Sequence, residues 1–145
     1  MRRNRPVQRK GAGRGTASRH LLLVDDDGAV REITAAMLRE LGYSVIEAGS
    51  AGAALDLLER HRNIDLAIVD FAMPGMNGIE LARRLRQLRP ALPILFITGF
   101  VDHAALVGVG KAEIIGKPFT LGDLADKLAL TLAAGRSASP VSLSG

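Results

Sequence analysis

Polar side chains follow four short, mostly apolar runs of this chain, at the point where each run ends. The set comprises Asp25 and Asp26 after residues 21–24, Asp70 after residues 66–69, Thr98 after residues 94–97 and Lys117 after residues 113–116. If the four runs are strands of one parallel sheet, their carboxyl ends gather these side chains at the same edge. That edge is where open α/β sheets bind ligands.

Three of the five side chains are carboxylates, and carboxylates placed close together repel one another. At least one of them must then be protonated, or the site must hold a cation. Ligands that are all oxygen favour a hard ion, and Mg²⁺, which keeps several of its waters, suits such a site. Together with a lysine and a threonine, the metal could surround a phosphoryl group and neutralise its oxygens during transfer to a carboxylate.

Each feature also has an ordinary structural interpretation. The sequence Asp-Asp-Asp-Gly after a strand is typical of turns and helix N-caps, and the segment from Asp70 to Gly78 could be a capped loop. The remaining two groups, Thr98-Gly99 and Lys117-Pro118, also suit loops. The three histidines share no ligand spacing and are predicted to be surface residues. The combination, rather than any single feature, therefore favours a phosphoryl site.

The elements that must position these groups form five repeats of a strand followed by a helix. The strands are predicted at Leu21–Val24, around Val45 and Ile46, and at Leu66–Val69, Ile94–Ile97 and Glu113–Gly116. Helices are predicted over 30–41, from the N-cap Ser50 to Leu58, over 79–88, weakly over 104–107, and over 121–132 behind a Thr120–Asp123 capping box. Continuous apolar strands are buried on both faces, which predicts a doubly wound α/β domain with a five-stranded parallel sheet.

Composition limits the classes of function. The 145 residues include no cysteine, which excludes thiol catalysis and cysteine-ligated metals. No apolar run has the ~18–20 residues of a membrane span, so we expect a cytoplasmic protein. Seven of the basic residues lie in the first 20 positions with no acid, and the other 125 positions carry 12 basic and 15 acidic side chains. We therefore expect a disordered basic arm over 1–19, a folded domain over 20–134 and a flexible tail over 135–145, with nucleic-acid binding at most weak and through the arm.

These motifs resemble the receiver domain of two-component response regulators. The resemblance covers about Leu21 to Ala134 and rests on four matches in order: Leu-Val-Asp25-Asp26-Asp27, Val-Asp70-Phe-Ala-Met-Pro-Gly-Met-Asn-Gly78, Ile-Thr98-Gly and Lys117-Pro118-Phe119. It implies a flavodoxin-like sheet with strand order 2-1-3-4-5 and a phosphoacceptor signalling role rather than an enzyme's. It also implies a sensor histidine kinase or phosphotransfer protein as phosphodonor. A downstream protein would bind the face formed by the fourth helix, fifth strand and fifth helix.

The resemblance also implies a role for each site residue. Asp70 looks like the phosphoacceptor, while Asp25 and Asp26 look like the acidic pair that binds Mg²⁺ together with Asp70 and the backbone carbonyl of Ala72. Thr98 would hydrogen-bond a phosphoryl oxygen, and Lys117 would pair with Asp70 and then with the phosphate.

Three features depart from the family's pattern. Ile114 stands where receivers often have an aromatic residue, three positions before the lysine, so an aromatic relay is not expected. The segment from Thr98 to Lys117 is a few residues short, which predicts a truncated fourth helix. About ten residues follow the last helix, too few for an output domain, which suggests a stand-alone receiver or one from a hybrid histidine kinase.

Two alternatives stay open at this point. A haloacid-dehalogenase-like phosphohydrolase would use Asp25 as nucleophile and align Thr98, Lys117 and the Gly122-Asp123…Asp126 segment with its other motifs. That reading leaves the segment from Asp70 to Gly78 without a role and needs Gly122-Asp123 to end a strand. The other alternative is a scaffold that has lost phosphorylation, which the complete set of site residues disfavours.

Overall fold

The apolar runs form one parallel sheet. A computed structural model gives the fold of residues 19–71, 77–99 and 114–144. The strands are β1 (His20–Val24), β2 (Ser44–Ala48), β3 (Leu66–Asp70), β4 (Ile94–Thr98) and β5 (Ile114–Gly116). They lie in the order β2-β1-β3-β4-β5, and every neighbouring pair is parallel. The predicted fold class and strand order are confirmed.

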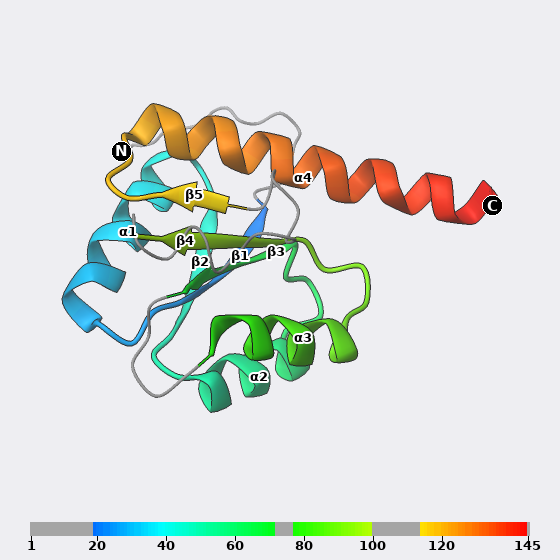
Figure 1. Cartoon of the computed structure of the whole chain (residues 1–145), viewed down its shortest axis with the longest axis horizontal. Helices are drawn as coiled ribbons and strands as arrows, with labels where there is room; N and C mark the ends of the chain where they lie inside the picture. Colours follow the sequence, from blue (N-terminus) through cyan, green and yellow to red (C-terminus); the bar gives the residue numbers. More distant parts are fainter. Residues whose placement is uncertain (1–18, 72–76, 100–113, 145) are drawn as a thin grey trace, which may run out of the picture.

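Among the described residues, four helices connect and cover the strands (Figure 1). They are α1 (Gly28–Glu40), α2 (Ala51–Arg60), α3 (Gly78–Leu88) and α4 (Leu121–Ser144). Side-chain caps begin them as the sequence suggests: the Ser50 hydroxyl accepts from the Ala53 N–H, and Thr120 and Asp123 form the reciprocal capping box. Gly42, with a φ of 100°, takes the left-handed conformation just after α1 that favours glycine there.

Two apolar layers sandwich the sheet. Side chains of one strand face pack with α2 and α3, and those of the other face pack with α1 and α4. In β1 the alternation is direct, since Leu22 and Val24 belong to the first layer and Leu21 and Leu23 to the second. The central strands β1, β3 and β4 are thus buried on both faces, which explains their nearly continuous apolar sequence and leaves the strand ends as the place for polar groups.

The buried face of α1 agrees only in part with the helical spacing of its apolar residues. Met37 and Leu41 pack against the core, whereas Val30 and Ile33 are 36% and 64% exposed. The helix also buries Thr34, Ala35 and Leu38. Its core-facing side is therefore turned away from Val30 and Ile33.

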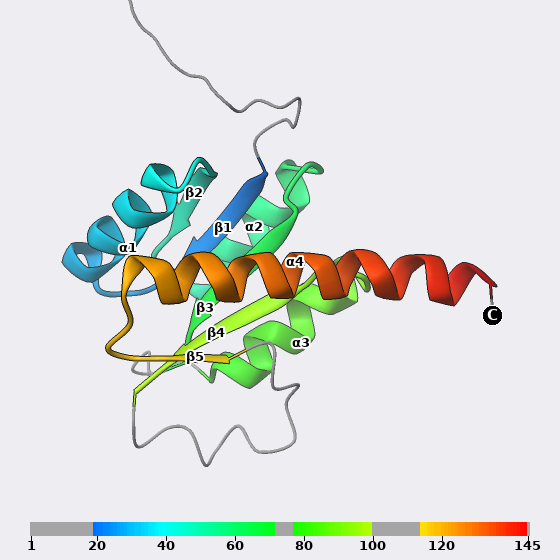
Figure 2. The same cartoon turned by 90° about the horizontal axis from the view of Figure 1, so that it is seen from above.

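The last helix is longer than the sequence predicts. Its apolar spacing indicates a helix over 121–132, whereas α4 continues to Ser144 and extends past the end of the sheet (Figures 1 and 2). Extending an existing helix adds one hydrogen bond for each residue fixed, so no new nucleation is needed. At the other end, Arg19 already joins the sheet edge, because its carbonyl accepts from the Ser44 N–H. The rest of the predicted arm and the weak helix over 104–107 lie outside the described residues.

Candidate functional site

Asp25 and Asp70 lie side by side at the carboxyl ends of two neighbouring strands. Val24 of β1 pairs with Val69 of β3, so the next residue of each strand reaches the same level. Both aspartates are almost fully buried, at 2% and 5% exposure. The Asp25 N–H donates to the Ala48 carbonyl of β2, which fixes the first residue beyond β1.

Crowding of the two carboxyl groups changes the acidity of Asp25. Burial raises its pKa from 3.8 to about 6, because the charged form loses hydration. The Asp27 N–H, which donates to the Asp25 Oδ1 at 2.9 Å, lowers the pKa. Repulsion by Asp70 and a hydrogen bond between the two side chains raise it again, and Lys117 lowers it slightly. The pair therefore favours a proton or a cation, as predicted from the clustered carboxylates.

Thr98 is the last residue of β4, beside β3. Asp70 pairs with Ile97, so Thr98 lies one residue further toward the same edge of the sheet. It is completely buried, and its Oγ1 has no hydrogen-bond partner among the described residues. A buried hydroxyl without a partner costs roughly 1–3 kcal/mol, so this group is suited to a ligand that supplies an acceptor.

Lys117 approaches Asp70 along the same edge of the sheet, from the end of β5. Gly116 of β5 pairs with Thr98, and the Lys117 N–H donates to the Thr98 carbonyl at 2.7 Å. The Lys117 Nζ lies 3.8 Å from the Asp70 Oδ2. Its side chain is 41% exposed, so the ammonium group is accessible to an incoming anion. The lysine is followed by a cis peptide bond to Pro118.

The structure thus brings together four of the predicted site residues: Asp25, Asp70, Thr98 and Lys117. Asp26 is next to them in sequence and exposed to solvent. Ala72 lies outside the described residues. Within the described part of the chain, no three acidic or histidine side chains are grouped closely enough to hold a metal.

The residues present nevertheless fit a hard cation together with a phosphoryl group. Two buried carboxylates share one edge, an exposed third follows directly, and oxygen is the ligand type that Mg²⁺ prefers. Burial and, to a smaller extent, repulsion by Asp70 raise the pKa of Asp25, and a cation bound beside the two carboxylates would offset both effects. The unpartnered Thr98 hydroxyl and the Lys117 ammonium group offer donors to phosphoryl oxygens.

The geometry does not suit the phosphohydrolase alternative. Gly122 and Asp123 lie in the first turn of α4 rather than at the end of a strand. The Asp123 carboxylate accepts from the Thr120 N–H at 3.0 Å, so it is engaged in capping the helix. Ile114 is a half-buried residue of β5, the strand in which the sequence predicts it.

Arg31 is a residue near the site that the sequence did not single out. Its Nη1 donates to the Asp25 carbonyl at 2.7 Å. An arginine six residues after an acidic pair is an unremarkable feature of a helix surface, so only the folded chain shows the contact.

Comparison with known proteins identifies the family. Residues 21–129 match the response regulator receiver domain. The chain therefore belongs to the receiver domains of two-component signalling, which are phosphoacceptor signalling domains rather than classical enzymes and which interact with histidine kinases or phosphotransfer proteins. Among the described residues, no helix is long and apolar enough to cross a membrane.

Individual relatives differ in how much of their length this chain covers. The response regulator receiver protein CpdR of Brucella abortus is 34% identical over 113 residues, which are 76% of this chain and 93% of CpdR. The sensor kinase CckA of the same organism is 35% identical over 114 residues, 76% of this chain but 12% of CckA. A solved receiver domain protein of Methanospirillum hungatei is 30% identical, with a TM-score of 0.72 over 84% of this chain and 99% of that one.

Proposed function

We propose that this chain accepts a phosphoryl group on Asp70 from the phosphohistidine of a sensor histidine kinase or phosphotransfer protein, with the help of Mg²⁺. The observation that carries the proposal is the arrangement of buried Asp70 between Asp25 on one side and Lys117 on the other, beside the unpartnered hydroxyl of Thr98. A nucleophilic carboxylate, a cation site and two donors are the groups that phosphoryl transfer needs.

In the transfer step, a carboxylate oxygen of Asp70 attacks phosphorus in line with the phosphohistidine nitrogen. The new P–O bond forms as the P–N bond breaks, and the electron pair of that bond returns to the donor imidazole. Lys117 moves from pairing with Asp70 toward the added phosphoryl oxygens, and the Thr98 hydroxyl donates to one of them. The buried Thr98 hydroxyl, which has no hydrogen-bond partner among the described residues, thereby gains one.

Asp25, Asp26 and Asp70, with the Ala72 carbonyl, are the proposed Mg²⁺ ligands. Mg²⁺ supplies charge neutralisation at the transferring phosphoryl oxygens. Asp26 is exposed to solvent, whereas Asp25 and Asp70 are buried. We therefore expect Asp26→Asn to weaken Mg²⁺ binding without lowering the free energy of unfolding.

The donor protein has to cover the rim of this site. Transfer requires its phosphohistidine within bonding reach of Asp70, so the neighbouring surface is buried on docking. Val30 and Ile33 of α1 lie on that side, on the helix that follows the acidic pair, and both are exposed. We assign them to contact with the phosphodonor.

A downstream protein partner is proposed for the face that includes β5 and α4. A pocket of about 400 Å³ there is lined by Ile114, Ile115, Gly116, Phe119, Asp123, Asp126, Lys127 and Leu130. Leu130 is 58% exposed. Apolar side chains beside charges of both signs are typical of protein interaction surfaces. The predicted fourth helix of this face lies outside the described residues.

The test is to locate the phosphoryl group. The full chain would be incubated with Mg²⁺ and acetyl phosphate, the acyl phosphate trapped with borohydride, and the modified peptide identified by mass spectrometry. We expect modification of Asp70 and its loss in Asp70→Asn. Asp65→Asn, a matched change at the opposite edge of the sheet, should be modified like the parent. Modification of Asp25 would support the phosphohydrolase instead, and the absence of any modification would contradict the proposal.

A further inference from the structure

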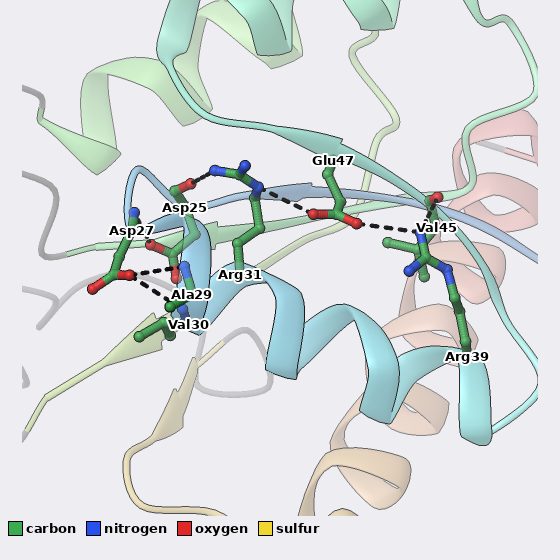
Figure 3. Close-up of polar contacts among 8 residues, drawn as sticks. All are labelled: Asp25, Asp27, Ala29, Val30, Arg31, Arg39, Val45 and Glu47. Carbon is green, nitrogen blue, oxygen red and sulfur yellow. Dashed lines mark hydrogen bonds and ion pairs between the residues drawn. The ribbon is translucent and has the colours of Figure 1, made fainter.

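We infer that Arg31 is a positioning residue for the Mg²⁺ site, which it orients by holding the peptide group between Asp25 and Asp26. The inference rests on the proposed metal-dependent function. The contact of Arg31 at the site is with the backbone carbonyl of Asp25 rather than with the side-chain oxygens of Asp25 or Asp26. Arg31 therefore acts on the metal ligands through the backbone. Figure 3 shows the contacts of Arg31 with Asp25 and Glu47.

Asp25 is the first residue beyond β1, so the sheet does not hold both sides of its backbone. Its N–H still donates to the Ala48 carbonyl of β2. Its carbonyl accepts from the Arg31 Nη1 at 2.7 Å, within the range of a strong charge-assisted hydrogen bond. Because a peptide group is planar, fixing this carbonyl also fixes the Asp26 nitrogen. The direction in which the Asp26 side chain leaves the backbone is thus set partly by Arg31.

The guanidinium group is itself held in place from β2. Its Nε donates to the Glu47 Oε1 at 3.2 Å, and the other Glu47 oxygen accepts from the Arg39 Nη2 at 3.3 Å. Arg39 also donates to the Val45 carbonyl at 3.1 Å. Arg31 and Glu47 are each about one-quarter exposed, and Arg39 about one-half. A row of contacts therefore leads from Arg39, in the last turn of α1, through Glu47 and Arg31 to the Asp25 carbonyl at the site (Figure 3).

Glu47 also offsets the positive charge of Arg31 beside the proposed cation site. An unpaired guanidinium group beside the acidic pair would repel Mg²⁺ and weaken its binding. The Glu47 carboxylate offsets that charge, so Arg31 contributes the geometry of its planar donor group with little opposing field. A lysine could not reproduce this arrangement, because a single ammonium group lacks the fixed fork that reaches both acceptors.

Gly49 leaves room for the guanidinium group. A Cβ at that position would lie 3.1 Å from the Arg31 Nη1, the same nitrogen that donates to Asp25. That distance is tighter than ordinary contact, so a methyl group would displace the nitrogen by a few tenths of an ångström. Gly49→Ala thus moves the donor without changing any charge, and provides an independent test.

The experiment is calorimetric titration of Mg²⁺ into the full chain, with thermal unfolding recorded for every variant. We expect Arg31→Gln to raise the Mg²⁺ dissociation constant about ten-fold, at the low end of effects of residues that orient metal ligands. Gly49→Ala should raise it by a smaller factor, and Arg31→Lys should lie between parent and Arg31→Gln. Arg39→Gln removes the same charge from the same helix but leaves the hydrogen bond to the Asp25 carbonyl. This control should leave the Mg²⁺ dissociation constant unchanged or slightly lower.

The sign of the effect distinguishes positioning from charge. Loss of a positive charge alone strengthens cation binding, so tighter or unchanged binding by Arg31→Gln would overturn the inference. If Arg31→Gln unfolds, Gly49→Ala decides, and parent-like Mg²⁺ binding by that variant would equally overturn it. A parent chain that binds no Mg²⁺ would instead contradict the proposed function. As a second readout, the Mg²⁺ concentration for half-maximal phosphorylation should rise in Arg31→Gln more than the maximal rate falls.

Discussion

The carboxyl and amino edges of the sheet differ in how well their polar groups are paired. At the carboxyl edge, where Asp25 and Asp70 lie, two buried acids repel each other and the Thr98 hydroxyl has no partner among the described residues. The amino edge, where the strands begin, shows the reverse. The His20 N–H donates to the Asp65 Oδ2 at 2.7 Å, and the Asp65 N–H donates to the His20 carbonyl at 2.7 Å.

Arg89 is the main polar connection at the amino edge. It follows α3 and donates to the carbonyls of Ile64, Leu58 and His61 at 3.0–3.1 Å. These contacts complete the end of α2 and tie it to the segment before β3. One edge of the sheet therefore stabilises the fold, while the other gives up stability to keep groups ready for a cation and a phosphoryl group.

Breaking the amino edge should have the largest effect on stability. We expect Arg89→Ala to lower the free energy of unfolding by about 2–3 kcal/mol, because three carbonyls lose a charged donor. Urea denaturation would measure it. Arg83→Ala, which removes only a surface ion pair with Glu80, should cost less than about 0.5 kcal/mol. Equal costs for the two variants would contradict the assigned role of Arg89.

The same substitution at the two edges should have opposite signs. Without metal at pH 7, we expect Asp25→Asn to raise the free energy of unfolding by about 1 kcal/mol, because it removes a charge beside Asp70. Asp65→Asn should lower it by about 1 kcal/mol, because a neutral amide accepts less strongly from the His20 N–H. Chemical denaturation of both variants measures the two changes in the free energy of unfolding. A lower free energy of unfolding for Asp25→Asn would contradict the proposed difference between the edges.

The pH dependence of stability should carry a smaller signature of the carboxyl edge. The pKa of Asp25 is about 6 in the folded chain and 3.8 ordinarily, so between these values the folded state binds more protons than the unfolded state. The contribution of Asp25 to stability is therefore present at low pH and lost as the pH rises from about 4 to 6. Denaturation with a chelator present, at several pH values, should show a shallower decline for Asp25→Asn. A curve that matches the parent's would argue against the raised pKa.

The sequence was sufficient for the sheet and for the residues at its carboxyl edge, because both depend on where apolar runs stop. It was insufficient where packing chooses between similar surfaces. The spacing of Val30 and Ile33 suggested that both are buried, but the fold leaves them exposed and buries the polar Thr34 and the small Ala35 of the same helix. Contacts that join distant segments were also beyond reach: nothing in the spacing of Arg31 and Glu47, 16 residues apart, indicates that they meet.

The most direct test of the contrast between the edges is to supply what the carboxyl edge lacks. The free energy of unfolding would be measured for the full chain and for Asp70→Asn, with and without Mg²⁺ plus beryllium fluoride, an analogue of the phosphoryl group. For the parent we expect a gain of about 2.7 kcal/mol at ligand concentrations 100-fold above the dissociation constant, and for Asp70→Asn almost none. An equal gain in both proteins, or no gain in the parent, would contradict the conclusion that this edge is built to receive a phosphoryl group on Asp70.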